Sequence, residues 1–384
     1  MSASRLAHVD DLIQHWVSDE GLQTMVVLVA RRGVEVLHRA YGRLGPESDA
    51  PATPADAVFE LASVTKVLTA TTLMTLVEEG RVGLNRPVSS YIPEFQGEGK
   101  DAVLVRHLLT HTSGLRGDEV EEFAKEQKDK VVIPPTPATI HPLFHHSLLV
   151  RYGCPLWKRP GEEMSYCDYN FQLAAEIVRR VSGLPMDRAA YERVFRPLGM
   201  ESSFYCLVDV PRARRVRYPP TPGYSPDAED IARETERYWM GAGCALSSAA
   251  DLAVLGQTFL NGGAYGPARV LSPATVAAMT RDQIPGVRAE HHGMVFPDAG
   301  WGLGWALFGL KSSWNGGLHP PDSYWHTGNG GSMVWVDPRY ELVGVCLSAV
   351  PFFVTASDFT TATWATDWRN DLFEDAIIAA IEDP

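Results

Sequence analysis

The segment 59–68, FELASVTKVL, constrains this chain more than any other stretch. It contains a Ser-x-x-Lys pattern, and the apolar residues after it recur at helical spacing, which predicts a helix with one buried face. Three residues make just under one turn, so Ser63 lies in the first turn and Lys66 lies above it on the same face. The apolar residues of that face are Val67, Ala70, Leu73, Met74 and Val77.

This spacing allows Lys66 to take the proton of Ser63. A serine hydroxyl is a poor nucleophile until a base removes its proton, and a lysine kept neutral by burial and by another cationic group can be that base. The alternative is that Ser63 caps the helix and Lys66 is solvated. Two facts favour catalysis: no other lysine follows a serine by three residues, and Lys66 lies in an otherwise apolar segment.

The composition excludes several classes of partner. The formal charge of −13 on 384 residues argues against nucleic acid and anionic membrane surfaces. No apolar run is long enough to span a bilayer, and the acidic first residues show no secretory signal. The five cysteines are odd in number and scattered, as is typical of reduced thiols. We therefore expect a cytoplasmic protein that binds neither membrane nor nucleic acid; its oligomeric state stays open.

Strand patterns lie at both ends of the chain and helix patterns lie between them. This arrangement predicts an α/β (α+β) fold: one central antiparallel sheet built from both chain ends, flanked by helices, with an inserted, mostly helical domain. The limits we expect are 1–82 with 237–384 for the α/β domain, and 83–236 for the helical one. The expected strands are 24–31, 34–41, 301–307, 323–327, 331–336 and 342–349, with terminal helices at 5–18 and 360–381.

His107 and His111 are four residues apart, a spacing that can bind a metal. No third ligand follows at a suitable distance, so capping and packing are favoured, and we expect no metal. Segments 117–160 and 207–236 are polar or proline-rich, which predicts loops; the first is typical of a lid or pocket wall. Such loops would set the acyl and leaving-group preference.

Two further stretches carry candidate chemistry. Tyr166 follows a Pro-Gly turn directly before a helix; a tyrosine near a lysine can titrate below its ordinary pKa and pass a proton to a leaving group. Taken alone, the pattern indicates a core tyrosine rather than a catalytic one. In 325–331, WHTGNGG, the glycines allow close backbone approach to a ligand, and the N–H of Asn329 could help hold an oxyanion. By itself this stretch is also a glycine-rich hairpin.

In chain order, Ser63/Lys66, Tyr166 and His326-Thr327-Gly328 resemble the serine β-lactamase and penicillin-binding-protein superfamily. The sequence is most similar to class C β-lactamases, family VIII carboxylesterases and D-aminopeptidase-type relatives. The resemblance covers about residues 8–380 and implies a β-lactamase-like fold with the active site at the domain interface. It includes the blocks VRHLLTHTSGL (105–115), PGEEMSYCDYNFQLAAEIVRRVSG (160–183), FRPLGMESS (195–203) and GAGCALSSAADLAVLGQTFLNGG (241–263).

The resemblance assigns roles to individual residues. It implies that Ser63 is the nucleophile, Lys66 its general base, and Tyr166 the proton relay to the leaving group. It implies an oxyanion hole made by the backbone N–H groups of Ser63 and Asn329. It also places Asp168, His326, Thr327 and Gly328 in the substrate-binding site. An acyl-serine intermediate forms and is then released, with no metal or cofactor.

Two departures from the family pattern bear on the activity. Asp168 stands where the family has asparagine, and its charge favours the ammonium form of Lys66, which shifts weight to Tyr166. His326 stands where the family has lysine; a mostly neutral histidine attracts a substrate carboxylate less. Both changes argue against a strong β-lactamase and are compatible with an esterase or amidase acting on uncharged or amine-bearing substrates.

The sequence therefore predicts a serine hydrolase, most simply a carboxylesterase on short acyl esters, favoured over a peptidase or amidase. Three alternatives remain open. One is a D-aminopeptidase, other amide hydrolase or DD-peptidase-like enzyme, with Asp168 holding a substrate amine. The others are an acyltransferase and an inactive sensor of the same fold. An unrelated α/β-hydrolase is disfavoured because no Gly-x-Ser-x-Gly is present.

Overall fold

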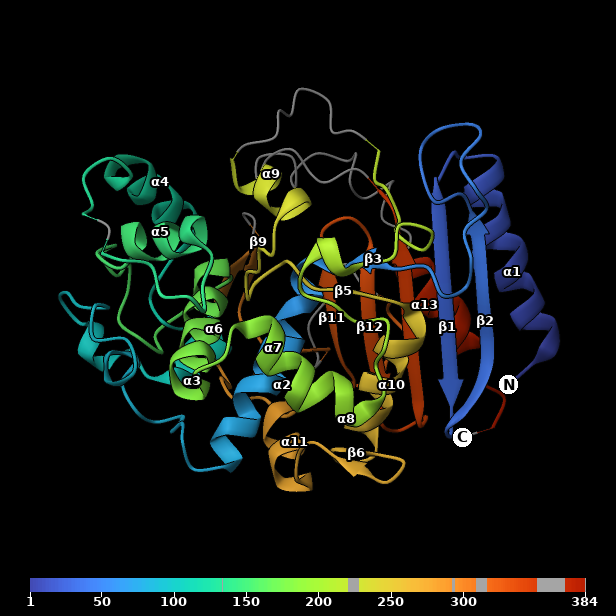
Figure 1. The fold of residues 1–384 in the computed structure, drawn as a ribbon. Helices are drawn as coiled ribbons and strands as arrows, with labels where there is room; N and C mark the ends of the chain where they lie inside the picture. The colour runs from blue at the N-terminus through green and yellow to red at the C-terminus, as the bar shows by residue number, and fades with distance from the viewer. Residues whose placement is uncertain (133, 220–227, 292–293, 309–315, 351–369, 384) are drawn as a thin grey trace.

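The computed structural model describes residues 1–132, 134–219, 228–291, 294–308, 316–350 and 370–383. Six strands of these parts form an antiparallel sheet in the order β10-β11-β12-β13-β1-β2 (Figure 1). Because β1 pairs with β13, the two chain ends build one sheet, as predicted. The strands are β1 Thr24–Arg31, β2 Val34–Gly42, β10 Ala306–Leu307, β11 Tyr324–Gly328, β12 Ser332–Asp337 and β13 Leu342–Ser348.

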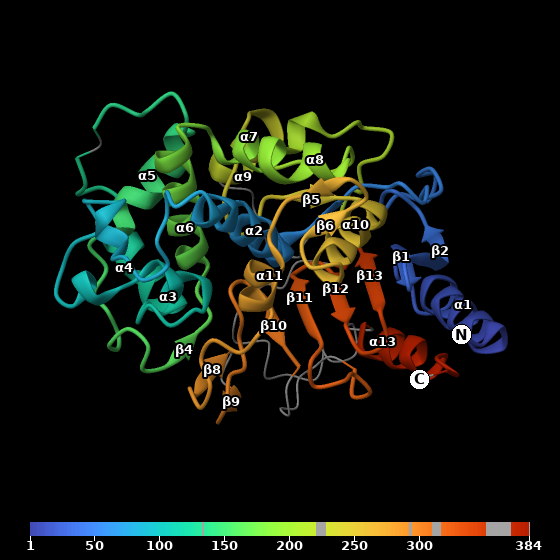
Figure 2. The same cartoon turned by 90° about the horizontal axis from the view of Figure 1, so that it is seen from below.

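Helices cover both faces of the sheet (Figure 2). On one face α1 (Ala3–Ser18) and α13 (Asn370–Ala379) pack in one apolar cluster with Trp335. On the other face α2 (Thr65–Glu78) and α10 (Ala249–Leu260) pack in a second cluster. Every residue of β12 and β13 is buried, so the sequences of these strands do not alternate between apolar and polar residues. Residues 360–369 of the expected last helix lie outside the described residues.

The remaining helices include a group, α3 to α6, that lies at the end of the molecule opposite α1 (Figures 1 and 2). The limits 83 and 236 of a helical domain remain a prediction. In chain order, all the remaining helices of the described residues are α3 Val105–Leu109, α4 Gly117–Gln127, α5 Pro142–Arg151, α6 Asp168–Ser182, α7 Met186–Ala190, α8 Arg196–Leu198, α9 Ala228–Thr235 and α11 Pro273–Met279. Short 3₁₀-helices are η1 Ala62–Val64, η2 Val88–Ser90, η3 Lys100–Ala102 and η5 Leu207–Asp209, and η4 Tyr191–Phe195 is a π-helix.

Short strands complete the chain. These are β3 Phe59–Glu60 with β5 Leu246–Ser247; β4 Met164–Ser165 with β8 Ala289–His291 and β9 Met294–Phe296; and β6 Ala264–Tyr265 with β7 Ala268–Arg269. None of the helices in the described parts has the length and apolarity that crossing a bilayer requires. All five cysteines are buried, and none forms a disulfide.

The prediction that 117–160 and 207–236 are loops is wrong in part, because they contain α4, α5, η5 and α9. In α5 the proline that suggested a break is the first helical residue, where a missing N–H has no consequence. The ring of His141 caps this helix by accepting the N–H of Leu143. Proline and histidine therefore begin the helix here.

Helix α2 differs from the expected amphipathic helix in two ways. Ser63 lies in η1, directly before the helix, and every residue from Thr65 to Leu76 is buried. Burial on all sides is possible because the threonine hydroxyls find partners, either within the helix or, for Thr69, at the Gly241 carbonyl. Thr71 donates to the carbonyl of Val67 and Thr72 to that of Leu68, at 2.7 and 2.8 Å. The helix that follows the nucleophile is thus a central, fully enclosed element.

The expected strand 301–307 is mostly a turn. Only Ala306–Leu307 is a strand, and the chain folds back so that Trp301 bridges Ala306. The N–H of Gly302 donates to the carbonyl of Trp305, and a Cβ on Gly302 would lie 2.0 Å from a backbone oxygen of Met279. Only glycine fits such a close approach, so residue 302 allows the turn between Trp301 and Ala306.

Candidate active site

Ser63 and Lys66 lie together in a site formed by η1, α2, α6 and the 241–245 segment. The Lys66 Nζ is 2.8 Å from the Ser63 Oγ, 3.0 Å from the Ala242 carbonyl oxygen and 2.6 Å from the Asp168 Oδ1. The Lys66 side chain is fully buried, whereas the Asp168 side chain is 61% exposed. An ammonium group has three N–H donors, so these three acceptors match its full donor set.

The charge state of Lys66 follows from two opposing influences. Burial, the largest, lowers its pKa, but the Asp168 carboxylate and then the Tyr166 phenol outweigh it and hold the pKa above the ordinary lysine value. Lys66 is therefore an ammonium at neutral pH. The expectation that an aspartate at 168 favours the charged form is confirmed.

Tyr166 lies between β4 and α6, half-buried, with the centre of its ring 4.8 Å from the Lys66 Nζ. Burial raises the pKa of the phenol, the Lys66 charge lowers it, and the Asp168 charge raises it again; the net pKa is raised. The expectation of a lowered pKa is wrong, because burial and the nearby carboxylate outweigh Lys66 and the hydrogen bonds with Lys66 and Ser63. Tyr166 is neutral at neutral pH.

His111 positions Tyr166, a role that spacing alone did not reveal. The two rings stack with centroids 4.3 Å apart. The His111 Nδ1 accepts the N–H of Cys167 and its carbonyl accepts that of Ser165, so both neighbours of Tyr166 are held. His107 likewise accepts the N–H of Leu104. Packing and capping are thus confirmed for both histidines. The family block VRHLLTHTSGL was the available signal for His111.

The backbone near Ser63 is tightly packed against the end of β11. A Cβ on Gly328 would lie 2.1 Å from the Leu61 carbonyl oxygen, which also accepts the Ser332 hydroxyl at 2.7 Å. Ala62 adopts φ 43°, a left-handed conformation that is strained for alanine. This close approach brings residue 329, directly after Gly328, to the turn that carries Ser63.

His326 is the middle residue of β11, two residues before Gly328, and is 2% exposed. Burial, and then the positive charge of Lys66, lowers the pKa of its imidazole to about 3. Its Nδ1 is 2.7 Å from the carbonyl oxygen of Thr327, which is half-buried. The prediction that His326 is neutral is confirmed, so it offers a substrate carboxylate no charge.

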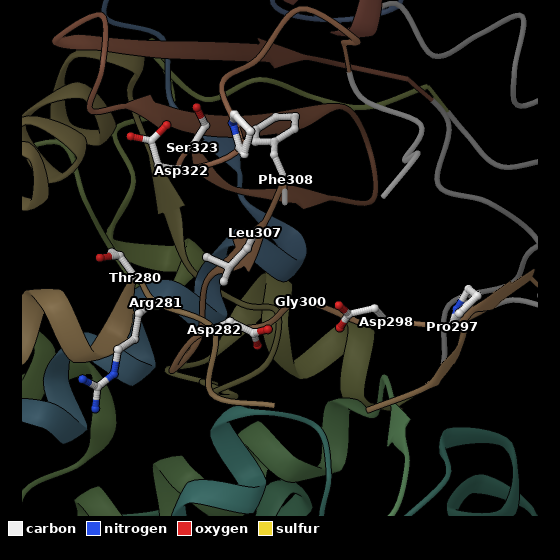
Figure 3. A pocket seen from close by; sticks show the side chains of 11 residues that line it. Thr280, Arg281, Asp282, Pro297, Asp298, Gly300, Leu307, Phe308, Asp322 and Ser323 are labelled. Atoms are coloured by element: carbon white, nitrogen blue, oxygen red, sulfur yellow. The ribbon is translucent and has the colours of Figure 1, made fainter. Parts of the chain in front are cut away.

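Apart from the Ser63 site, a cavity of about 560 Å³, called the second cavity below, lies beside the edge strand β10; none of the site residues predicted from sequence lines it (Figure 3). It is lined by Thr280, Arg281, Asp282, Pro297, Asp298, Gly300, Leu307, Phe308, Pro321, Asp322 and Ser323. Within the parts of the chain that are described, no group of three histidine, cysteine or acidic side chains could hold a metal ion.

The fold and the sequence match known proteins over nearly their full length. A "Putative D-alanyl-D-alanine carboxypeptidase" of Salmonella agona (strain SL483) is 27% identical over 382 residues, which cover 91% of this chain and 83% of that protein. A penicillin-binding protein homolog from Caulobacter crescentus has a TM-score of 0.75 at 22% identity, covering 99% of each chain. A family VIII carboxylesterase has a TM-score of 0.72 at 21% identity, again covering 99% of each chain.

The two solved structures show that the fold is shared, and the expected β-lactamase-like architecture is confirmed. Residues 9–360 match the family model named Beta-lactamase. The chain is therefore a serine hydrolase that belongs to the beta-lactamase family.

Proposed function

We propose that this protein is a carboxylesterase that hydrolyses short, uncharged acyl esters through an acyl-Ser63 intermediate, with weak or no β-lactamase activity. The ion pair between Lys66 and Asp168, at 2.6 Å, is the observation that carries the proposal. It leaves only a small fraction of the enzyme with a neutral amine at pH 7. An activated ester suits such a site, because its leaving oxygen departs more readily than an amide nitrogen.

In the first step, the fraction of enzyme with neutral Lys66 takes the Ser63 proton as the Ser63 Oγ attacks the ester carbonyl. The N–H groups of Ser63 and Asn329 hold the oxyanion. The C–O bond then breaks as Tyr166 gives its proton to the leaving oxygen and regains one from Lys66. In the second step water attacks the acyl carbon and its proton passes through Tyr166 to Lys66. The bond between the acyl carbon and the Ser63 Oγ then breaks, and the Oγ takes a proton from Lys66, which returns to the neutral amine.

The neutral ring of His326 supports the choice of uncharged substrates, because a buried neutral imidazole attracts no carboxylate. Thr327 and Gly328 complete the wall on that side in this proposal. A β-lactam or a peptide ending in D-alanine presents a carboxylate and would bind weakly. The partner we expect is therefore a small neutral ester. A cytoplasmic location and the absence of nucleic-acid or membrane binding remain predictions.

A second candidate is a D-aminopeptidase or related amide hydrolase. One observation favours it: the Asp168 carboxylate is 61% exposed, with one oxygen on Lys66. Its other oxygen could pair with the ammonium group of a substrate. Such a substrate would also weaken the hold of Asp168 on Lys66 and so favour the neutral amine.

The test compares initial rates on p-nitrophenyl acetate, p-nitrophenyl butyrate, nitrocefin and D-alanine p-nitroanilide, for the wild type and for Ser63→Ala. Ester turnover that is lost in the variant, with little nitrocefin cleavage, supports the esterase. Preference for the D-alanyl anilide selects the aminopeptidase instead. New ester products in the presence of an added alcohol identify an acyltransferase. A wild type that neither turns over substrate nor reacts with a fluorophosphonate is an inactive sensor.

A further inference from the structure

Two buried polar atoms beside Tyr166 have no hydrogen-bond partner in the described parts of the chain: the Trp301 Nε1 and the His326 Nε2. Their side chains are buried, with residues 301 and 326 only 7% and 2% exposed. The two rings meet edge to face, with centroids 5.9 Å apart. Buried polar atoms are nearly always paired, so two such atoms in one place indicate that a ligand or water completes them.

The two atoms have opposite hydrogen-bonding character. The His326 Nδ1 lies 2.7 Å from the Thr327 carbonyl oxygen, which can only accept, so the Nδ1 carries the proton. The ring is neutral and holds a single proton, so the Nε2 is a bare acceptor. The indole Nε1 of Trp301 can only donate. Together they present one donor and one acceptor.

Trp301 is held in place by hydrogen bonds of the backbone and not by its indole N–H. Its backbone N–H donates to the Asp282 carboxylate at 3.3 Å, and that oxygen also accepts the N–H of Ile284 at 2.9 Å. Asp282 and Gly300 line the second cavity, where Figure 3 shows both residues. The indole ring itself contacts the rings of His111 and Tyr166, with centroid distances of 5.2 and 6.1 Å.

The position beside Tyr166 indicates which part of a substrate these atoms meet. The Trp301 and His326 rings both flank the Tyr166 ring, at 6.1 and 6.4 Å. Under the proposed function Tyr166 gives its proton to the leaving oxygen, so a group that lies against both rings belongs to the leaving alcohol. This step rests on the proposed function.

We propose that the Trp301 indole N–H and the His326 Nε2 bind a hydroxyl or carboxamide group on the leaving alcohol of the substrate, and exclude a carboxylate there. Hydroxyl and primary carboxamide groups each donate and accept, so either satisfies both atoms. A carboxylate only accepts and would face the bare lone pair of His326. Trp301 and His326 are thus specificity residues for an alcohol with a neutral polar group.

The test uses four phenyl acetates that differ only in the meta substituent: methyl, carbamoyl, hydroxymethyl or carboxylate. Each kcat/KM is divided by the rate of hydroxide-catalysed hydrolysis, which removes the intrinsic reactivity of the phenol. In the wild type we expect the carbamoyl and hydroxymethyl esters to exceed the methyl ester roughly tenfold, mostly through KM, and the carboxylate ester to fall roughly tenfold below it.

Two variants test the donor and the acceptor one at a time. Trp301→Phe removes the donor, so the carbamoyl preference should fall to roughly twofold while the carboxylate ester stays disfavoured. His326→Lys replaces the acceptor by a cation, so the carboxylate ester should become the better substrate. Trp305→Phe is the matched control: residue 305 is fully buried and its indole N–H also has no partner in the described residues, but its ring packs on Phe259 and Tyr324 in the core.

The proposal is overturned if Trp301→Phe keeps the wild-type preference, or if Trp305→Phe changes it equally. Failure of the proposed function gives a different result, because then the wild type hydrolyses none of the four esters. In that case calorimetry with the free phenols still decides. Binding of meta-hydroxybenzamide that is stronger than that of meta-cresol, and that weakens in Trp301→Phe, supports the pair; equal binding refutes it.

Discussion

Replacing Asp168 by asparagine should increase esterase activity at neutral pH. The Asp168 Oδ1 lies 2.6 Å from the Lys66 Nζ, and its charge is the main reason that the pKa of Lys66 stays high despite full burial. Asparagine keeps an oxygen that can accept from the Nζ but carries no charge. The effect of burial on Lys66 is then opposed mainly by Tyr166, so the pKa of Lys66 falls and more of the enzyme holds the neutral amine that takes the Ser63 proton.

The size of the expected pKa shift of Lys66 follows from its distance to Asp168 and from the solvent exposure of the Asp168 side chain. An opposite charge this close shifts a pKa by about 1–3 units. Because the Asp168 side chain is 61% exposed, solvent screens part of its charge, and we take about 1–2 units. Well below the pKa of Lys66, the neutral fraction rises tenfold for each unit by which that pKa falls. The kcat/KM for p-nitrophenyl acetate at pH 7 should therefore rise roughly 10–100-fold.

The assay is the pH dependence of kcat/KM between about pH 6 and pH 10. In the profile of kcat/KM against pH, the rise in activity should occur about 1–2 pH units lower in Asp168→Asn than in the wild type. Asp298→Asn is the control, because it removes a carboxylate of the second cavity, whose charge is not among the influences on Lys66. A rise that stays in place, or moves to higher pH, would refute the assignment of Lys66 as the base that Asp168 restrains.

Three further predictions concern other parts of the molecule. Tyr166→Phe should lower kcat for p-nitrophenyl butyrate roughly 10²–10⁴-fold without changing the melting temperature; a loss below about threefold excludes proton relay. Gly328→Ala should lower the free energy of unfolding in urea by about 1–3 kcal/mol, because its Cβ would lie 2.1 Å from a backbone oxygen; an unchanged value contradicts this. The pKa of His319 is lowered by burial, but the carboxylates of Asp337 and Glu374 outweigh burial and raise it to about 9. This stabilisation is complete below about pH 6.5 and is lost as pH rises through about 9, so the free energy of unfolding should fall by about 3 kcal/mol over that range, and less in His319→Gln; equal slopes would contradict it.

Local patterns predicted the elements whose geometry is itself local. The hairpin β1–β2 follows from two runs of strand-forming residues around Arg32-Gly33, and Ser63 meets Lys66 because three residues span one helical turn. Local reasoning failed where a distant contact decides the conformation. Trp301 lies in a turn rather than a strand, because Gly302 passes against the backbone of Met279.

The sequence by itself therefore determined the family, the sheet made from both chain ends, and the residue types available for acyl-serine chemistry. Only the tertiary structure decided their charge states. Lys66 is an ammonium and Tyr166 is neutral because folding buries Lys66 fully and Tyr166 in part beside Asp168, and the resulting pKa values depend on burial and on charges that come from distant segments. The donor–acceptor pair of Trp301 and His326 arises in the same way, since no sequence spacing records which buried atoms find no partner.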